Sequence, residues 1–380
     1  MPDKKMKTKI FRPTWLEIDL AALEFNFRQV KRQIAKGVKV LCVVKADAYG
    51  HGIVDVSKKL SRLHVDYLGV ASIDEAIILR KAGIKLPILI LEHSLAQFAK
   101  YIVDYNLTQC VSTLELAKSI SDYARKKKKT ALVHIKIDTG MGRLGIWHKQ
   151  AVNFVKNITR LDSLKIEGIY THFPCADIDR AFTNHQIKDF SSLISELKKN
   201  NIRISLCHAA NSIGVIDYKD CHLNLVRPGL MLYGIYPKAS LRSKIKLKPV
   251  LSFKTKIIYL KRIPAGRSIS YGRTHITAKP TTIATLPVGY SDGYLRSLSN
   301  KADVLVKGVR CKVVGRVCMD QTMVDLSNLK RIKIGDTVVL VGRQGKDRIT
   351  LEELAGLAGT ISYELACLIG KNTVARIYKN

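Results

Sequence analysis

One lysine stands where an amine catalyst could work. Lys45 follows the apolar run at residues 40–44 and precedes two small alanines, the hydroxyl of Tyr49, and Gly50 and Gly52. A lysine after such a run is most often a solvated strand end. Here the alanines leave room for a planar ligand, and the glycines permit close approach of the backbone. A lysine amine in such a place suits Schiff-base formation with an aldehyde cofactor.

A glycine-rich segment at residues 136–145 contains the literal pattern Gly-x-Gly-x-x-Gly, which is typical of dinucleotide-binding loops. A dinucleotide-binding strand is nearly all apolar, whereas Lys136 and Asp138 place charges on this one. That interpretation also leaves Lys45 unexplained. Arg143, within the loop, instead resembles a clamp for a carboxylate, because a guanidinium can bind both carboxylate oxygens.

Three later apolar runs also end in groups that could bind a ligand. His172 ends the first, although a lone histidine at a strand end is more often structural. Asn211 and Ser212 follow the second, where they either cap a helix or help to bind an anion. The third ends in Arg227 and Gly229, where the usual phosphate site of a parallel barrel would lie.

Eight apolar runs precede residue 235, and amphipathic stretches separate most of them. The runs are 40–45, 67–71, 87–91, 109–112, 132–138, 166–172, 204–208 and 223–227. Helical periodicity marks residues 94–105, 114–128, 149–160 and 183–199. Repeated strand-helix units of this number predict a (β/α)8 barrel of the TIM type, with functional groups at the carboxyl ends of the strands.

After Pro237 strand-like runs dominate, at 251–263, 281–288, 302–306, 311–326, 337–341 and 373–378. We therefore expect an α/β barrel domain at residues 1–240 and a mainly-β C-terminal domain at 241–380. Whether the N-terminal strand joins the β domain stays open at this point.

The charge balance is unusual, because 64 Lys and Arg face 31 Asp and Glu, for a net charge of +33. This invites a nucleic-acid interpretation. However, the basic stretches are not interleaved with aromatic residues, and no DNA-binding motif is recognisable. We expect a basic surface without a specific nucleic-acid partner. The lack of an apolar export or membrane segment and of Cys-x-x-Cys pairs predicts a cytoplasmic protein with reduced cysteines and no metal.

Seven blocks of this sequence resemble the alanine racemase family in order and spacing. They lie at residues 43–52, 136–145, 208–212, 226–229, 270–273, 289–293 and 315–320. The resemblance implies a pyridoxal 5'-phosphate barrel plus a β domain in a head-to-tail homodimer whose active sites are shared between subunits. It implies interconversion of L- and D-alanine by two-base proton transfer on a cofactor external aldimine, which supplies D-alanine for peptidoglycan.

The same resemblance assigns the residues. Lys45 would hold the cofactor and act as one base, and Tyr271 of the partner subunit would act as the other, because inversion requires a donor and an acceptor on opposite faces. Arg227 would face the pyridine nitrogen, with His172 hydrogen-bonded to it. The remaining assignments are Tyr49, Ser212, Gly229, Leu230 and Tyr363 at the phosphate with Asn211 beside them; Arg143 and the Met319 amide at the substrate carboxylate; Tyr290 at the entrance; and a carbamate on Lys136, paired with Arg143.

Two neighbouring activities stay open. A racemase of broader or different specificity, for serine or a basic amino acid, fits much of the same sequence. Fold-related pyridoxal-phosphate decarboxylases also join a barrel to a β domain, but the Tyr271 block and Arg227 argue against them, because decarboxylases keep an acidic partner on the pyridine nitrogen.

Overall fold

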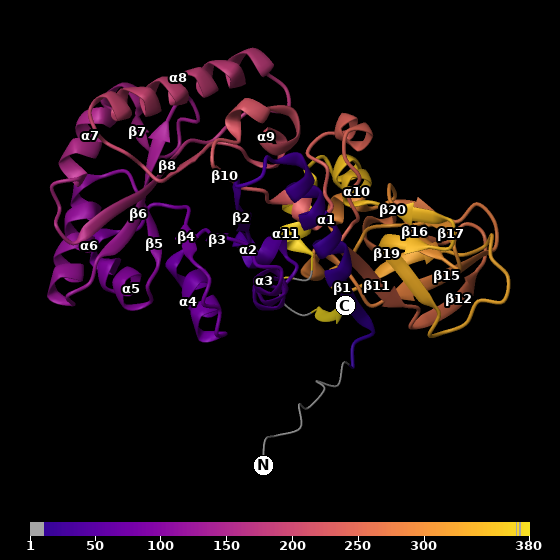
Figure 1. The fold of residues 1–380 in the computed structure, drawn as a ribbon. Coiled ribbons are helices and arrows are strands. Elements are labelled where there is room, and N and C mark those ends of the chain that lie inside the picture. The colour runs from indigo at the N-terminus through magenta and orange to yellow at the C-terminus, as the bar shows by residue number, and fades with distance from the viewer. Residues whose placement is uncertain (1–10, 370, 372–373) are drawn as a thin grey trace. The chain divides into compact units, whose positions relative to one another are not determined.

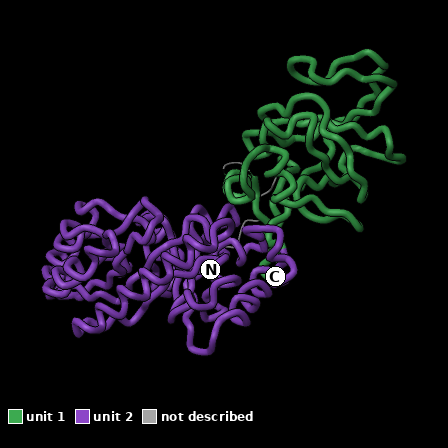
Figure 2. The backbone as a smooth tube through the Cα atoms, turned by 90° about the horizontal axis from the view of Figure 1, so that it is seen from above, with its two compact units in different colours: residues 1–21, 249–380 green, residues 22–248 purple. Residues whose placement is uncertain are grey.

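A computed structural model describes residues 11–369, 371 and 374–380. It divides into two compact units, which Figure 2 shows in different colours. The barrel unit comprises residues 22–248, and the β unit comprises residues 1–21 and 249–380.

The barrel unit is built on eight parallel strands, which confirms the eight strands predicted. They are β2 (Lys39–Val43), β3 (Tyr67–Val70), β4 (Ile88–Ile90), β5 (Thr108–Val111), β6 (Ala131–Asp138), β8 (Leu164–Tyr170), β9 (Leu206–His208) and β10 (Leu225–Val226). Their order is β10-β2-β3-β4-β5-β6-β8-β9, and the short β7 (Ile146–Trp147) pairs with β6. Between the two end strands, the amide of Arg227 donates to the carbonyl of Ala210 at 2.9 Å. The barrel is therefore nearly closed, and the predicted fold class is confirmed.

Helices lie outside these strands in Figure 1. They are α1 (Leu20–Gln33), α3 (Ile53–Arg62), α4 (Ile73–Lys81), α5 (Ala99–Asp104), α6 (Leu114–Lys126), α7 (Ala151–Ile158), α8 (Arg180–Lys199) and α9 (Ser212–Asp217). Side chains of Ser72, Thr113, Asp179 and Asn211 accept amide hydrogen bonds at the first turns of α4, α6, α8 and α9. Such caps satisfy amides that have no partner within the helix, which is why these helices begin where they do.

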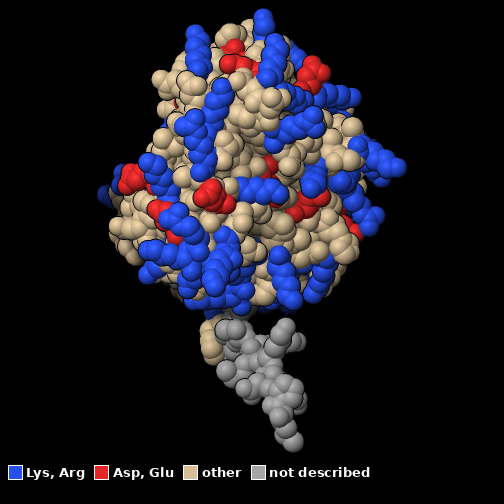
Figure 3. Space-filling model, turned by 60° about the vertical axis from the view of Figure 1, so that its left-hand side comes forward, with Lys and Arg blue, Asp and Glu red and all other residues tan. Residues whose placement is uncertain are grey.

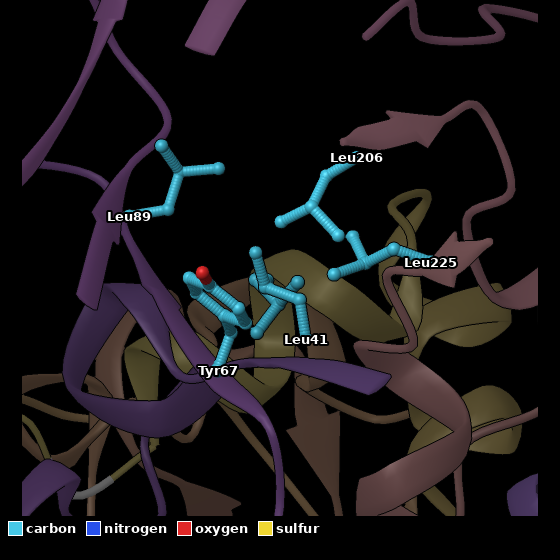
Figure 4. Packing of buried hydrophobic residues seen from close by; sticks show 6 residues of the cluster. Leu41, Tyr67, Leu89, Leu206 and Leu225 are labelled. Atoms are coloured by element: carbon cyan, nitrogen blue, oxygen red, sulfur yellow. The ribbon is translucent and has the colours of Figure 1, made fainter. Parts of the chain in front are cut away.

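The barrel interior is apolar on one side and polar on the other. A buried cluster from β2, β3, β4, β9 and β10 converges there (Figure 4), and its members are Leu41, Val43, Tyr67, Leu89, Leu206 and Leu225. Strand β6, on the opposite side, buries polar side chains instead, namely those of His134 and Lys136. Branched apolar residues usually fill such barrels, and buried polar groups cost free energy unless they are hydrogen-bonded. The polar side therefore calls for a functional explanation.

The β unit is mainly antiparallel, which confirms the second half of the predicted fold class. Its large sheet has the order β17 (Val309–Lys312), β16 (Asp303–Val306), β19 (Thr337–Gln344), β11 (Leu251–Lys256), β1 (Thr14–Asp19), β21 (Ala375–Lys379), with β20 (Asp347–Ile349) beside β19. The N-terminal strand β1 thus pairs with two strands of the C-terminal region. A second sheet holds β12 (Tyr259–Ile263), β15 (Thr281–Leu286) and β18 (Thr322–Asp325), and β13 (Ser268–Ile269) pairs with β14 (His275–Ile276). Two helices, α10 (Leu351–Ala358) and α11 (Ser362–Leu368), complete the unit.

Lys and Arg side chains are spread over the face drawn in Figure 3 and are not confined to one stripe. The densest basic run of the sequence, residues 125–129, covers the end of α6 and the turn that precedes β6, away from the carboxyl ends of the strands. None of the helices in the described part of the chain has the length and apolar character needed to cross a membrane.

Candidate active site

Lys45 is separated from the end of β2 by Val44 alone and begins a left-handed turn, α2 (Lys45–Tyr49). The φ angles of Ala46, Asp47, Ala48 and Tyr49 lie between 53° and 55°. For residues other than glycine this conformation costs roughly 1–2 kcal/mol each. Backbone strain of this kind persists only where the surrounding structure enforces it, and it concentrates at functional sites.

Three side chains enforce the turn. The Nδ1 atom of His51, which is fully buried, donates to two carbonyl oxygens of the turn at 3.0 and 2.8 Å. The carboxylate of Asp47 accepts the amide of Ile53 at 2.7 Å, at the start of α3. Glu75 accepts the amides of Asp47 and Ala71 at 3.3 and 2.8 Å. The sequence motif around Lys45 is therefore also a structural device that fixes where the lysine emerges.

A second group at the same end of the barrel has the features of a phosphate cradle. The hydroxyl of Ser212 accepts the amides of Gly229 and Met231 at 3.0 and 3.4 Å, which leaves its own proton available for a ligand. A Cβ atom on Gly229 would lie 2.8 Å from the hydroxyl oxygen of Tyr49. The structure thus brings Tyr49, Ser212, Gly229 and the adjacent Leu230 together, and Asn211 uses its side-chain oxygen to cap α9.

Arg227 lies immediately after β10 and is 4% exposed. Its Nη1 donates to Nδ1 of His208 at 2.8 Å, and its Nη2 donates to the carbonyls of Thr171 and Ala209 at 2.6 and 3.0 Å. Burial lowers the pKa of Arg227 to about 10, so the guanidinium stays charged at neutral pH. These bonds use three of its five N–H groups, which leaves donors for a ring nitrogen.

The hydrogen bond expected between His172 and Arg227 is not found among the described residues, where the imidazole partner of Arg227 is His208. His172 is nevertheless part of the same cluster. Burial, followed by the charges of Arg227, Lys136, Arg143 and Lys45, holds the pKa of His172 well below its ordinary value. The imidazole is therefore neutral and surrounded by cations.

Lys136 projects from β6 into the barrel and is 3% exposed. Its Nζ lies 4.8 Å from the ring centroid of Tyr170, and no described residue forms a hydrogen bond with it. Burial, together with the charge of Arg227, lowers the pKa of Lys136 to about 7. Much of this lysine is thus an uncharged amine at neutral pH.

The glycine-rich loop after β6 is held by Asp138. One carboxylate oxygen accepts the amides of Gly140 and Met141 at 2.8 and 2.9 Å, and the carboxylate also accepts the amide of Gly142. The charge of Asp138, which speaks against a dinucleotide strand, therefore shapes the loop that carries Arg143.

Three predicted residues of the β unit lie on neighbouring loops. Tyr271 is 71% exposed and follows Ser270, whose φ is 63°. The hydroxyl of Ser270 lies 3.4 Å from Sγ of Cys318, and the carbonyl of Cys318 accepts the amide of Tyr290 at 3.1 Å. Because Met319 is the next residue, the structure brings Tyr271, Tyr290 and Met319 together on one surface. Tyr363 lies in α11 of the same unit.

Comparison with known families identifies the chain. A model described as the alanine racemase N-terminal domain matches residues 18–237, and one described as the C-terminal domain matches residues 250–378. The chain belongs to the alanine racemase family. The resemblance stated from the seven sequence blocks is therefore confirmed.

Related sequences and solved structures support the same family. An alanine racemase of Halothermothrix orenii is 46% identical over 99% of each chain, and one of Methanococcus maripaludis is 42% identical over 97% of this chain and 99% of that one. The structure of an alanine racemase from Clostridium difficile matches with a TM-score of 0.93 at 39% identity over 98% and 97% of the chains. A Bacillus anthracis alanine racemase with bound L-Ala-P matches with a TM-score of 0.92 at 36% identity over 98% and 96% of the chains.

Alanine racemases are pyridoxal-phosphate-dependent isomerases, and the cofactor expected from the sequence is the cofactor of the family. The residues of this racemase suit that group, because one end of the barrel presents a lysine, the hydroxyls of Tyr49 and Ser212 beside Gly229, and a charged guanidinium. Sequence reasoning did not select His208, His51 or Glu75. His208 and His51 lie inside motif blocks and could have been noticed, whereas Glu75 carries no local signal.

Proposed function

We propose that this racemase interconverts L- and D-alanine at the carboxyl end of its barrel and thereby supplies D-alanine for peptidoglycan. The observation that carries the proposal is the strained turn that presents Lys45 beside the cradle at Gly229 and the buried guanidinium of Arg227. When bound, pyridoxal phosphate supplies an aldehyde that captures the substrate amine and a conjugated ring that delocalises electrons from the substrate Cα. Tyr49, His172, Asn211, Ser212, Arg227, Gly229, Leu230 and Tyr363 hold this cofactor together with Lys45.

Two bases move the proton. The Nζ of Lys45 exchanges a proton with the substrate Cα on one face, and the phenol oxygen of Tyr271 of the partner subunit does so on the other face. Inversion follows when one group removes the proton and the other returns one. Arg227 would hold the pyridine nitrogen as a hydrogen-bond donor that does not give up its proton, which would limit how far the ring withdraws electrons. This donor also separates the proposal from decarboxylation chemistry, which uses an acidic partner there.

The substrate carboxylate binds to Arg143 and to the amide of Met319, and Tyr290 narrows the entrance. The uncharged amine of Lys136 attacks carbon dioxide and loses one proton, which forms a carbamate anion that pairs with Arg143. Its pKa of about 7 supports this step, because only an unprotonated amine reacts. Mass spectrometry of the native protein under carbon dioxide tests it, and an unmodified Lys136 under these conditions would remove it.

We propose a head-to-tail homodimer in the cytoplasm. The exposure of Tyr271 supports the dimer, because a catalytic base works inside a substrate site and a partner subunit would supply that site. Seven of the eight cysteines, namely Cys42, Cys110, Cys175, Cys207, Cys221, Cys311 and Cys318, are free thiols, which is the state that a reducing compartment maintains.

The test is a racemisation assay on a panel of L- and D-amino acids with chiral product detection. Alanine should be the fastest substrate, and Lys45→Ala should lose both activity and the visible absorbance of bound cofactor. Faster turnover of serine or a basic amino acid, or release of carbon dioxide from the substrate, would contradict the proposal. Mixed Lys45→Ala and Tyr271→Phe subunits should recover part of the activity, and no recovery after verified subunit exchange would contradict the shared site.

A further inference from the structure

A continuous line of hydrogen bonds runs through the barrel interior away from Arg227. Nη1 of Arg227 lies 2.8 Å from Nδ1 of His208, and Nε2 of His208 lies 2.8 Å from Nδ1 of His134. Nε2 of His134 lies 3.2 Å from one carboxylate oxygen of Glu167, and the phenol of Tyr67 donates to the other at 2.7 Å. We call His208, His134, Glu167 and Tyr67 the interior chain.

The interior chain connects the two ends of the barrel. Arg227 and His208 stand at the carboxyl ends of β10 and β9, His134 and Glu167 lie midway along β6 and β8, and Tyr67 is the first residue of β3. Tyr67 points into the interior as a member of the apolar cluster (Figure 4). Both histidines are fully buried, whereas the side chain of Glu167 is 19% exposed. The line thus starts at the cofactor end and finishes at a carboxylate with limited access to water.

The pairing of β6 with β8 is irregular where the interior chain crosses it. The register of β6 against β8 shifts so that Val133 pairs with Ile166 and His134 pairs with Gly168, which leaves Glu167 as the extra residue of a β-bulge. Bulges re-aim side chains and are common next to active sites. A Cβ atom on Gly168 would lie 2.5 Å from the ring of His134, so the glycine provides the space that this imidazole occupies.

From Arg227 to Glu167 every hydrogen bond is donated in the same direction, and Tyr67 donates to Glu167 from the opposite side. A guanidinium can only donate, so Nδ1 of His208 must accept from Arg227, and the proton of a neutral His208 must then sit on Nε2. Nε2 of His208 therefore donates to Nδ1 of His134, which leaves the proton of His134 on Nε2, facing Glu167. The contacts of one arginine and one carboxylate fix both tautomers.

The electrostatic surroundings keep the intermediate groups neutral and the end group charged. Burial, followed by the charge of Arg227, holds the pKa of His208 well below its ordinary value, and His134 and Lys136 act in the same direction. Burial also lowers the pKa of His134, although Glu167 opposes the shift. Burial alone raises the pKa of Glu167, but the hydrogen bonds from His134 and Tyr67 and the charge of Lys39 outweigh it and leave the pKa below its ordinary value.

We propose that the interior chain holds Arg227 as the hydrogen-bond donor to the ring nitrogen through fixed histidine tautomers, with Glu167 as the distant counter-charge. His208, His134 and Glu167 are then positioning residues for racemisation. If the tautomers reversed, an N–H of His208 would face an N–H of Arg227, and the guanidinium would be displaced. The proposal rests on the proposed place of Arg227 at the cofactor, but the tautomers follow from the protein alone.

The first test is a two-bond proton–nitrogen NMR spectrum of the holoenzyme with 15N-labelled histidine, assigned by single histidine substitutions. His134 and His208 should be neutral with the proton on Nε2 from pH 6 to 9. His51 is the internal contrast, because its Nδ1 donates to backbone carbonyls and should carry the proton. A proton on Nδ1 of His208, or a charged His134, would overturn the proposal.

The second test compares two variants at the same carboxylate. Glu167→Gln removes the charge and offers His134 either an acceptor or a donor, so a second tautomer of His134 should appear in the spectrum. The kcat should fall about tenfold, equivalent to ~1.4 kcal/mol in the barrier, with little change in KM. Tyr67→Phe removes one hydrogen bond but no charge, so the spectrum should stay unchanged and kcat should fall less than about threefold. Equal losses in both variants would overturn the proposal.

A variant that keeps every polar group covers the case in which Glu167→Gln does not fold. Gly168→Ala displaces the ring of His134 and should produce the same second tautomer, and an unchanged spectrum with unchanged kcat would count against the chain. The NMR spectrum also separates the two proposals. Fixed tautomers in a protein that does not racemise alanine would refute the proposed function alone, and racemisation with reversed tautomers would refute the chain alone.

Discussion

In the left-handed turn after Lys45, the positive φ angle of Ala46 decides whether a glycine there raises or lowers the free energy of unfolding. Ala46 is exposed, with φ 53° and ψ 52°. Glycine adopts this region freely, so Ala46→Gly relieves roughly 1–2 kcal/mol of strain. The greater freedom of glycine in the unfolded chain costs about 0.4–1 kcal/mol in return. We therefore expect Ala46→Gly to raise the free energy of unfolding by about 0.5–1 kcal/mol.

The matched control is the same substitution in a right-handed helix. Ala181 is exposed in the first turn of α8, in the same compact unit, and Ala181→Gly should lower the free energy of unfolding by about 0.5 kcal/mol. For a unit of this size a change of 1 kcal/mol corresponds to a shift in Tm of about 2–4 °C. Urea denaturation followed by circular dichroism measures both variants.

We also expect the Ala46→Gly substitution to change the activity. A glycine at position 46 lets the backbone leave the left-handed region, so kcat of Ala46→Gly should fall a few-fold while stability rises. If Ala46→Gly destabilises the protein as much as Ala181→Gly does, the strain argument is wrong.

Three further predictions follow from buried groups and a strained loop. The pKa of Lys136 falls from its ordinary value of 10.5 to about 7, so between pH 7 and 10.5 the unfolded chain binds more protons than the folded protein. In carbon dioxide-free buffer the free energy of unfolding should therefore rise with pH across this window. The Lys136→Met variant should show no such rise. Gly229→Ala should weaken cofactor affinity about tenfold or more in a dissociation assay, because the added methyl group would collide with Tyr49. The control is Gly356→Ala, which should leave the affinity unchanged because a Cβ atom there meets no atom within 4 Å. Ser270→Ala should lower kcat more than KM, because it removes the 2.6 Å hydrogen bond that anchors the loop of the tyrosine base, and an unchanged kcat would contradict that role.

Local sequence patterns were sufficient to predict much of the barrel. Apolar runs separated by amphipathic stretches located all eight strands, since buried parallel strands are continuously apolar and their covering helices are not. Lys45 and Arg227 could be proposed as functional because each directly follows such a run, and the carboxyl ends of parallel strands meet at one end of a barrel. The assignment of Tyr271 depended on the family resemblance, since a tyrosine among short strands has no local signal of function.

Other features depend on contacts that local patterns do not encode. The turn after Lys45 is left-handed because His51 and Glu75 bind its backbone, although its alanines by themselves favour the right-handed region. The glycine-rich loop is folded around Asp138 and not around a dinucleotide.

The sequence by itself determined where the eight barrel strands lie, where reactive side chains follow them, and that the charge excess is not gathered into a nucleic-acid motif. Only the tertiary structure decided which side chains meet inside the barrel. Tyr67 and Glu167 are 100 positions apart and touch because the barrel nearly closes, and a bulge in β8 turns Glu167 toward His134. Periodicity assigns a side chain to the inside or outside of a strand, whereas closure and register set its partners, which is why the line from Arg227 to Glu167 emerges only from the fold.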